Sequence, residues 1–255
     1  MVYPSSSTKI DPWLVIFRPN PNARLRLFCF PFAGGSAMAY RAWPEELPAA
    51  IEVCAVQLPG RESRLREAPA TSLPNLIPTL TDALSPYFTL PFAFFGHSMG
   101  ALIGFELARY LRKMKRPGPV HLFYSGHRAP QLPDPDPPLH VLPEPQFVTA
   151  IRNFNGTPEA VLQHPELMQL VLPILRADFT LVETYTYQPD EPLNCPISAL
   201  GGVQDKDATR EELDALRQQT RRAFSLRMFA GDHFYLNDQR TALLKAVAQD
   251  LRPFL

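Results

Sequence analysis

The stretch PFAFFGHSMGALIGFELARYL, residues Pro91–Leu111, contains a short polar interruption between two apolar segments. The first segment, Phe92–Phe95, reads as a buried strand, and Ala101–Leu111 has the apolar spacing of a helix. Gly-x-Ser-x-Gly between a strand and a helix is the pattern of the nucleophile elbow, a sharp turn that lifts a serine hydroxyl above the edge of a sheet. The sequence therefore predicts that Ser98 is a nucleophile, with an ordinary turn serine as the alternative.

Short apolar or β-branched runs recur along the rest of the chain. Most are too continuous for strands with one solvent face, so we expect parallel strands covered by helices on both faces. The predicted strands are 25–30, 51–58, 92–95, 120–124, 197–200 and 226–229. Because 255 residues are within the range of one α/β domain, we expect residues 1–255 to form a single domain around a mostly parallel sheet.

One segment departs from this alternation. A proline-rich connector at 129–145 leads into a helical block at 146–187, which we interpret as an insertion. Within it, PELMQLVLPILRADF (165–179) is apolar on nearly every face. The block is either part of the core or a cap over a hydrophobic pocket, and the side chains expected to form that cap are Leu167, Leu170, Val171 and Ile174.

The composition excludes several classes of partner. The 25 Lys and Arg residues balance the 25 Asp and Glu residues, so no net charge attracts nucleic acid or an anionic membrane. No apolar run reaches the ~18 residues of a membrane-spanning helix, and residues 1–13 lack the pattern of a secretory leader. Cys29, Cys54 and Cys195 adjoin apolar runs without metal-ligand spacing, so we expect reduced core thiols, no metal site and a cytoplasmic protein.

A serine nucleophile needs an imidazole base, and the imidazole needs a carboxylate to orient it. In a fold with this elbow the chain order is serine, acid, histidine. His233 follows the last predicted strand, and Asp205 follows the strand before it, so both lie at the same edge of the sheet as Ser98. Asp205 is the preferred acid, Asp207 is the alternative, and Asp232 is less favoured because adjacent side chains diverge.

The oxyanion formed by attack on a carbonyl requires backbone N–H donors aimed at it. One such donor comes from the residue after the nucleophile, and the other comes from a loop after an early strand. Here these positions correspond to the N–H groups of Met99 and of Ala33 in the loop FPFAGGS.

Several motifs together closely resemble the type II thioesterases, a family of free-standing α/β-hydrolases. The resemblance extends from about Trp13 to the C-terminus and rests on FPFAGGS (30–36), VQLPGRE (56–62), PFAFFGHSMGAL (91–102), LRADF (175–179) and GDHFYL (231–236). Relatives often have proline after the catalytic aspartate, whereas this chain has Lys206, so Asp207 remains an alternative.

The resemblance implies hydrolysis of acyl groups, short and stalled or aberrant, from the phosphopantetheine arms of acyl or peptidyl carrier proteins in polyketide or non-ribosomal peptide synthesis. It implies a triad of Ser98, Asp205 and His233, oxyanion donors at Ala33 and Met99, a helical lid at 146–187, no cofactor and a monomer. Carrier proteins are commonly acidic, so Arg61, Arg64 and Arg66 form a candidate contact, with a solvated loop as the alternative.

Other functions remain open at this point. A general carboxylesterase, a medium-chain fatty acyl thioesterase and a product-cyclising thioesterase share this fold, and a non-catalytic hydrolase-like binding module belongs to another class. A complete triad argues against the binding module. A chain that starts at its own Met1, without a carrier segment, argues against a cyclising enzyme.

Overall fold

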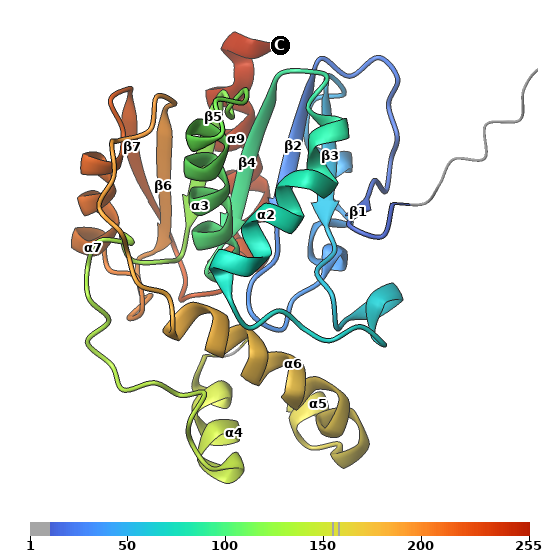
Figure 1. The fold of residues 1–255 in the computed structure, drawn as a ribbon, viewed down its shortest axis with the longest axis vertical. Coiled ribbons are helices and arrows are strands. Elements are labelled where there is room, and N and C mark those ends of the chain that lie inside the picture. Colours follow the sequence, from blue (N-terminus) through green and yellow to red (C-terminus); the bar gives the residue numbers. More distant parts are fainter. Residues whose placement is uncertain (1–10, 155, 158) are drawn as a thin grey trace, which may run out of the picture.

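The computed structural model describes residues 11–154, 156–157 and 159–255, and within them seven strands form one sheet (Figure 1). The strand order is β1-β3-β2-β4-β5-β6-β7, and neighbours from β3 to β7 are parallel. The strands are β1 Leu14–Val15, β2 Leu25–Phe30, β3 Ile51–Val56, β4 Phe92–His97, β5 His121–Ser125, β6 Ile197–Gly202 and β7 Phe224–Phe229.

The predicted parallel sheet is therefore confirmed, with small shifts at strand ends. The sequence pattern missed β1, which pairs antiparallel with Val56 and Ala55. Two residues are too few to show an alternating pattern, so only the pairing with β3 identifies this edge strand.

Helices cover both faces of the sheet, as the continuous apolar strands require. Side chains of α2 and α3 share one core cluster with β2 and β4, whereas α1 and α9 pack into a second cluster on the opposite face. Figure 1 shows α2 and α3 in front of the sheet and α9 behind it. The helices of the sheet layers are α1 Trp43–Glu46, α2 Leu73–Leu84, α3 Met99–Lys113, α7 Arg210–Asp214, α8 Tyr235–Asp238 and α9 Arg240–Leu251, with 3₁₀ turns η1 Ala37–Tyr40, η2 Glu62–Arg64, η3 Ser85–Tyr87, η4 Ala215–Gln219 and η5 Arg252–Phe254.

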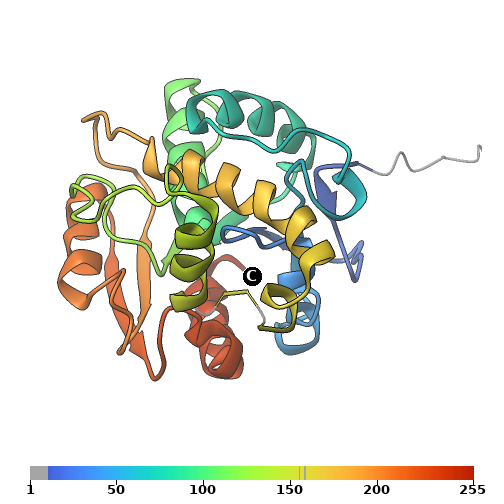
Figure 2. The ribbon, with the colours of Figure 1, turned by 90° about the horizontal axis from the view of Figure 1, so that it is seen from below.

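The predicted helical block is present at the carboxyl edge of the strands (Figures 1 and 2). It consists of α4 Glu144–Asn153, α5 Glu159–Leu162 and α6 Pro165–Glu183, and α6 continues through Pro173. These helices share a small core that includes Phe147, Ile151 and Leu175. The block therefore has apolar contacts of its own, and α6 crosses the edge of the sheet at which the predicted site residues lie.

The expected cap face of α6 is wrong. Leu167 is 41% exposed and Leu170 is 53% exposed, while Val171 and Ile174 are only half-buried. Apolar residues occur along the whole of α6, but the N-terminal turns of the helix extend past the edge of the sheet and do not cover it. Later turns of α6 line the pocket instead, as described below.

The three arginines offered as a candidate contact for a carrier protein do not form an exposed cluster, and Arg61 and Arg64 do not fit the alternative of a solvated loop either. Arg61 is buried, and Arg64 is buried against the Trp13 ring, 3.9 Å from its centroid, while pairing with Glu67. Only Arg66 of the three is exposed. Two of the three cations are therefore engaged within the fold and do not form a docking patch.

Two further features follow from the described residues. Cys29, Cys54 and Cys195 are buried free thiols, as predicted. Among the helices described in the structure, none combines the length and apolar character that crossing a bilayer would need.

Candidate active site

Ser98 occupies a strained turn between β4 and α3. Its backbone has φ 53° and ψ −121°, a conformation that a residue with a side chain rarely adopts. The Ser98 N–H donates to the carbonyl of Ser125 at 2.8 Å, which holds the turn against the end of the neighbouring strand β5. The predicted strand–elbow–helix geometry is confirmed, and strain of this kind is typical of functional sites.

The two glycines of the elbow are required by close backbone contacts. A Cβ atom on Gly96 would lie 2.0 Å from the carbonyl oxygen of Gly100, and one on Gly100 would lie 2.1 Å from the carbonyl oxygen of Phe30. Any side chain at either position would therefore collide with backbone. The contact with Phe30 brings the start of α3, including Met99, against the loop that follows β2.

His233 and Asp205 come from loops after adjacent strands and form a buried pair. His233 Nδ1 lies 2.9 Å from Asp205 Oδ2, and both residues are less than a tenth exposed. The loops approach closely at Gly202, where a Cβ atom would lie 2.2 Å from the carbonyl oxygen of Asp232. Because a carboxylate can only accept, Nδ1 donates and Nε2 is left as the proton acceptor of the neutral ring.

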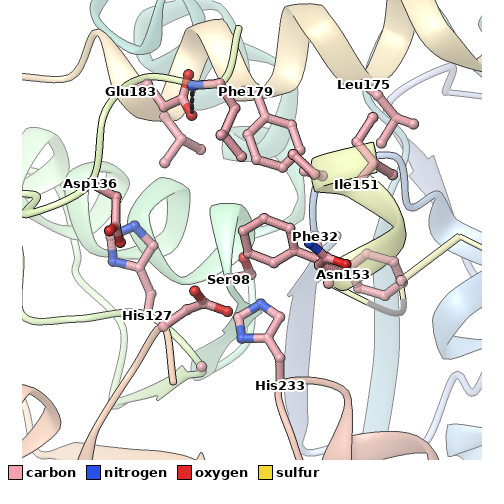
Figure 3. Close-up of a pocket in the computed structure, with 18 of the residues that line it drawn as sticks. Phe32, Ser98, His127, Asp136, Ile151, Asn153, Leu175, Phe179, Glu183 and His233 are labelled. Atoms are coloured by element: carbon pink, nitrogen blue, oxygen red, sulfur yellow. Dashed lines mark hydrogen bonds between the residues drawn. The ribbon is translucent and has the colours of Figure 1, made fainter. Parts of the chain in front are cut away.

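Ser98 and His233 line the same pocket, and Figure 3 shows their side chains next to one another at its base. The structure thus brings together the serine, the imidazole and the carboxylate that the sequence pattern singled out. This constellation is able to perform nucleophilic acyl transfer, in which the imidazole takes the serine proton.

The two alternative acids have other positions. The Asp207 backbone N–H donates to Asp205 Oδ1 at 2.9 Å, so it helps to orient the preferred acid. The Asp207 carboxyl lines the pocket, where burial raises its pKa. Asp232 accepts the N–H of Phe234 at 3.0 Å within its own loop. Of the three carboxylates, the one hydrogen-bonded to the His233 ring is Asp205.

Ligand-type atoms of Asp205, Asp207 and His233 lie within 4.8 Å of one another. Such a cluster of three could in principle hold a cation. However, the hydrogen bond between Asp205 and His233 already uses Nδ1 and one carboxylate oxygen. The geometry therefore favours a paired acid and base over a metal centre.

Ala33 lies in a tight turn after β2, in which the Gly35 N–H donates to the carbonyl of Phe32 at 2.8 Å. Within the described part of the chain, the N–H groups of Ala33 and Met99 donate to no protein acceptor. Ala33 lines the pocket beside Ser98. Two unused donors near the serine are what an oxyanion hole requires.

His97 adjoins the nucleophile in the sequence, which predicts that it packs or hydrogen-bonds near the elbow, and the structure places it in a buried network beside His233. His97 Nδ1 is hydrogen-bonded to Ser125 Oγ at 2.8 Å, which in turn lies 2.7 Å from the hydroxyl of Tyr235. The His97 and His233 ring centroids are 5.0 Å apart. Burial first, and the charge of His233 second, hold the pKa of His97 well below its ordinary value, so His97 stays neutral. The partners of His97 in this network, Ser125 and Tyr235, were not predicted from the sequence.

The pocket has a volume of about 410 Å³ and lies between the sheet edge and the helical block (Figure 3). Its lining combines apolar side chains with polar groups. The apolar lining consists of Phe32, Ile151, Phe154, Leu175, Phe179 and Val182, and the polar lining includes His127, Arg128, Asp134, Asp136, Glu183 and Asp207. An apolar chamber above a serine suits an acyl chain.

Comparison with known proteins agrees with this geometry. A sequence model of the thioesterase domain family matches residues 25–251. The gramicidin S biosynthesis protein GrsT of Aneurinibacillus migulanus is 46% identical over 245 residues, covering 96% of each chain. Thioesterase PikA5 of Streptomyces venezuelae is 42% identical over 89% of this chain and 81% of its own. The solved structure of the type II thioesterase BorB from the borrelidin biosynthetic cluster superposes with a TM-score of 0.87 at 38% identity, covering 94% of this chain and 98% of BorB. The predicted α/β-hydrolase fold is thereby confirmed.

Proposed function

The chain belongs to the thioesterase family, and from that premise we propose that it removes stalled acyl groups from the phosphopantetheine arms of acyl or peptidyl carrier proteins. It is a hydrolase that acts on thioesters. Of its relatives, GrsT is named for gramicidin S biosynthesis, PikA5 is named as a thioesterase, and BorB is named as a type II thioesterase of the borrelidin biosynthetic cluster. The observation that supports the reaction most directly is the strained Ser98 placed in one pocket with the buried His233–Asp205 pair.

In the proposed first step, Ser98 Oγ attacks the thioester carbonyl carbon while its proton moves to His233 Nε2. The carbonyl oxygen becomes an oxyanion that accepts hydrogen bonds from the N–H groups of Ala33 and Met99. Collapse of this intermediate breaks the C–S bond, and the departing pantetheine sulfur takes the proton from His233. The acyl group is then bound to Ser98 as an ester.

In the second step, His233 removes a proton from a water molecule, which attacks the acyl ester. The same two N–H groups stabilise the second oxyanion, and the proton returns to Ser98 as the carboxylic acid leaves. Asp205 keeps Nδ1 protonated throughout, so that Nε2 remains the acceptor, and it stabilises the imidazolium that forms in each step.

The helical block at 146–187 acts as a lid in this proposal. Its helices α4 and α6 contribute Ile151, Leu175 and Phe179 to the apolar lining, so the acyl group lies beneath the block. The carrier arm has to thread past it to reach Ser98. We also propose that the reaction takes place in the cytoplasm and that the enzyme acts as a monomer.

Kinetics with one acyl group on three leaving groups tests this function. Propionyl is presented on a carrier protein, on coenzyme A and as a p-nitrophenyl ester. We expect the highest kcat/KM for the carrier, because binding energy from the carrier orients the thioester. Equal kcat/KM for carrier and coenzyme A would remove the carrier-editing role, and a preference for the oxygen ester would indicate a carboxylesterase.

The matched variant is Ser98→Ala. We expect at least a ~10³-fold loss of thioester hydrolysis, because triad members act as a unit. A far-UV circular dichroism spectrum like that of the parent shows that the fold is intact. Activity within tenfold of the parent would reject Ser98 as the nucleophile.

A further inference from the structure

An ion pair buried beside the pocket joins the lid helix to the loop after β3. Arg61 Nη2 lies 2.7 Å from Asp178 Oδ1, and Arg61 Nη1 lies 2.8 Å from Asp178 Oδ2. The side chains are only 4% and 1% exposed. Asp178 belongs to α6, whereas Arg61 precedes η2, so this two-point contact ties together segments that are 117 residues apart.

The same two side chains also hold the turn Phe32–Gly35. The Gly34 N–H donates to Asp178 Oδ2 at 2.7 Å, and Arg61 Nη1 donates to the carbonyl of Gly35 at 2.9 Å. Gly34 has φ +75°, and a Cβ atom there would lie 2.5 Å from Leu175 Cδ2 on α6. The turn is therefore held by charged groups at two successive residues and packed against the lid helix.

This turn contains the peptide group that carries the proposed oxyanion donor. The carbonyl of Phe32 and the N–H of Ala33 belong to one planar peptide and point in opposite directions. The carbonyl accepts the Gly35 N–H at 2.8 Å across the turn. Fixing Gly34 and Gly35 therefore fixes the direction in which the Ala33 N–H points.

The burial of this pair is not explained by stability alone. Removing two charges from water carries a large desolvation penalty, and replacing a buried ion pair with apolar side chains of similar volume is often neutral or stabilising. A geometric role gives a reason for the charges, because a guanidinium and a carboxylate set the angles of several hydrogen bonds at once.

We propose that Arg61 and Asp178 are positioning residues that hold the Ala33 N–H in the direction required by the transition state. The proposal rests on the function proposed above, since it assumes that an oxyanion forms at Ser98. Neither side chain touches the reacting atoms. Both act through the backbone of the turn that they bind.

The test removes both charges together, so that neither is left buried and unpaired. The variant is Arg61→Met with Asp178→Leu, and the matched control is Arg227→Met with Asp250→Leu, which removes another two-point pair, at 2.5 Å and 2.6 Å, between β7 and α9. Loss of one oxyanion donor lowers kcat by ~10²–10³-fold. A misdirected donor should lower kcat by ~10–100-fold with little change in KM, whereas the control should keep the parent kcat per folded molecule.

A second readout separates positioning from general structural support. An alkyl boronic acid forms a tetrahedral adduct with the serine oxygen and places a boron-bound oxygen in the oxyanion hole, whereas the product carboxylate does not mimic the transition state. We expect the boronate dissociation constant to rise by the same factor as kcat falls, with product inhibition unchanged. Parent-like boronate affinity and kcat in the double variant would overturn the proposal.

Asp178→Asn provides the answer if the double variant does not fold. It keeps the size of the side chain but offers one oxygen to donors that now use two, so kcat and boronate affinity should again fall together, by at least ~10-fold. If both stay at parent values in this folded variant, the proposal is wrong. Failure of the parent enzyme to hydrolyse any thioester would instead reject the proposed function, and the two failures are therefore distinguishable.

Discussion

Exchange of a single oxygen atom at Asp205 is expected to inactivate the enzyme by changing which nitrogen of His233 holds the proton. Asp205 accepts two hydrogen bonds: one from His233 Nδ1 to Oδ2 and one from the Asp207 backbone N–H to Oδ1, both at 2.9 Å. In Asp205→Asn only one of these positions remains an oxygen. Since a backbone N–H can only donate, the amide oxygen has to face Asp207, and the NH₂ group then faces His233.

That arrangement forces Nδ1 of His233 to accept a hydrogen bond. The ring proton therefore moves to Nε2, the atom that has to accept the proton of Ser98. In a serine protease the same tautomer change lowers kcat by about 10⁴-fold, which corresponds to roughly 5 kcal/mol of transition-state stabilisation. We expect a loss of this size in Asp205→Asn, because the Asp207 N–H selects the unproductive orientation of the amide.

Asp207→Asn is the matched control. It retains the backbone N–H that donates to Asp205, and its side chain makes no hydrogen bond to His233 among the described residues. We therefore expect less than a ~10-fold change in kcat/KM.

The assay measures thiol release from a carrier-bound or coenzyme A thioester, and ¹⁵N NMR of the His233 ring reports its tautomer directly. The expected result is low activity together with protonated Nε2 in Asp205→Asn. The reasoning is refuted if Asp205→Asn retains activity within tenfold of the parent, or if Asp207→Asn is the more damaging change.

Three further outcomes are expected from the structure. Gly100→Ala should prevent folding or strongly lower the melting temperature, because its Cβ atom would lie 2.1 Å from a backbone oxygen at the end of β2. The control is Gly118→Ala, whose Cβ atom would have no atom within 4 Å, and its melting temperature should be nearly that of the parent. Burial lowers the pKa of His121 to about 4, below its unfolded value, so the unfolded chain binds the extra proton and stability falls as the pH drops through about 6.5. Urea unfolding should show about 2 kcal/mol lost from this group between pH 7 and pH 5, and this part of the slope should vanish in His121→Gln. Phe179→Ala should enlarge the pocket and shift kcat/KM by about tenfold in favour of longer acyl chains. The control Leu170→Ala, at an exposed position, should keep the chain-length preference of the parent. Competition between a short and a long acyl thioester measures this preference.

Much of the candidate site could be inferred from the sequence because its reacting residues occur in short motifs next to predicted strands. Continuous apolar runs identify buried parallel strands, and parallel strands place their carboxyl ends at one edge. Ser98, Asp205 and His233 each follow such a strand, so chain order and strand position together selected them. The glycines of the elbow belong to the same local pattern, although only the exclusion at Gly96 comes from the turn itself, because the atom that excludes a side chain at Gly100 is the Phe30 carbonyl oxygen of β2.

Only the tertiary structure decided contacts between segments that are distant in the sequence. The sequence preferred Asp205 but left Asp207 as an alternative, and only the hydrogen bond between Asp205 and His233, which joins two different loops, decides between them. Similarly, Arg61 resembles a solvated loop cation in the sequence but is buried against Asp178, 117 residues later.

The sequence by itself determined the layers of the fold, the elbow and the order of the reacting groups, because periodicity and backbone sterics act over a few residues. It did not determine which part of α6 covers the pocket, why His97 stays neutral, or the pairing of the two-residue strand β1. Each of these depends on which surfaces become buried when the chain collapses. Burial is a property of the whole fold, and so the environment of a side chain is settled only by neighbours that the local pattern does not name.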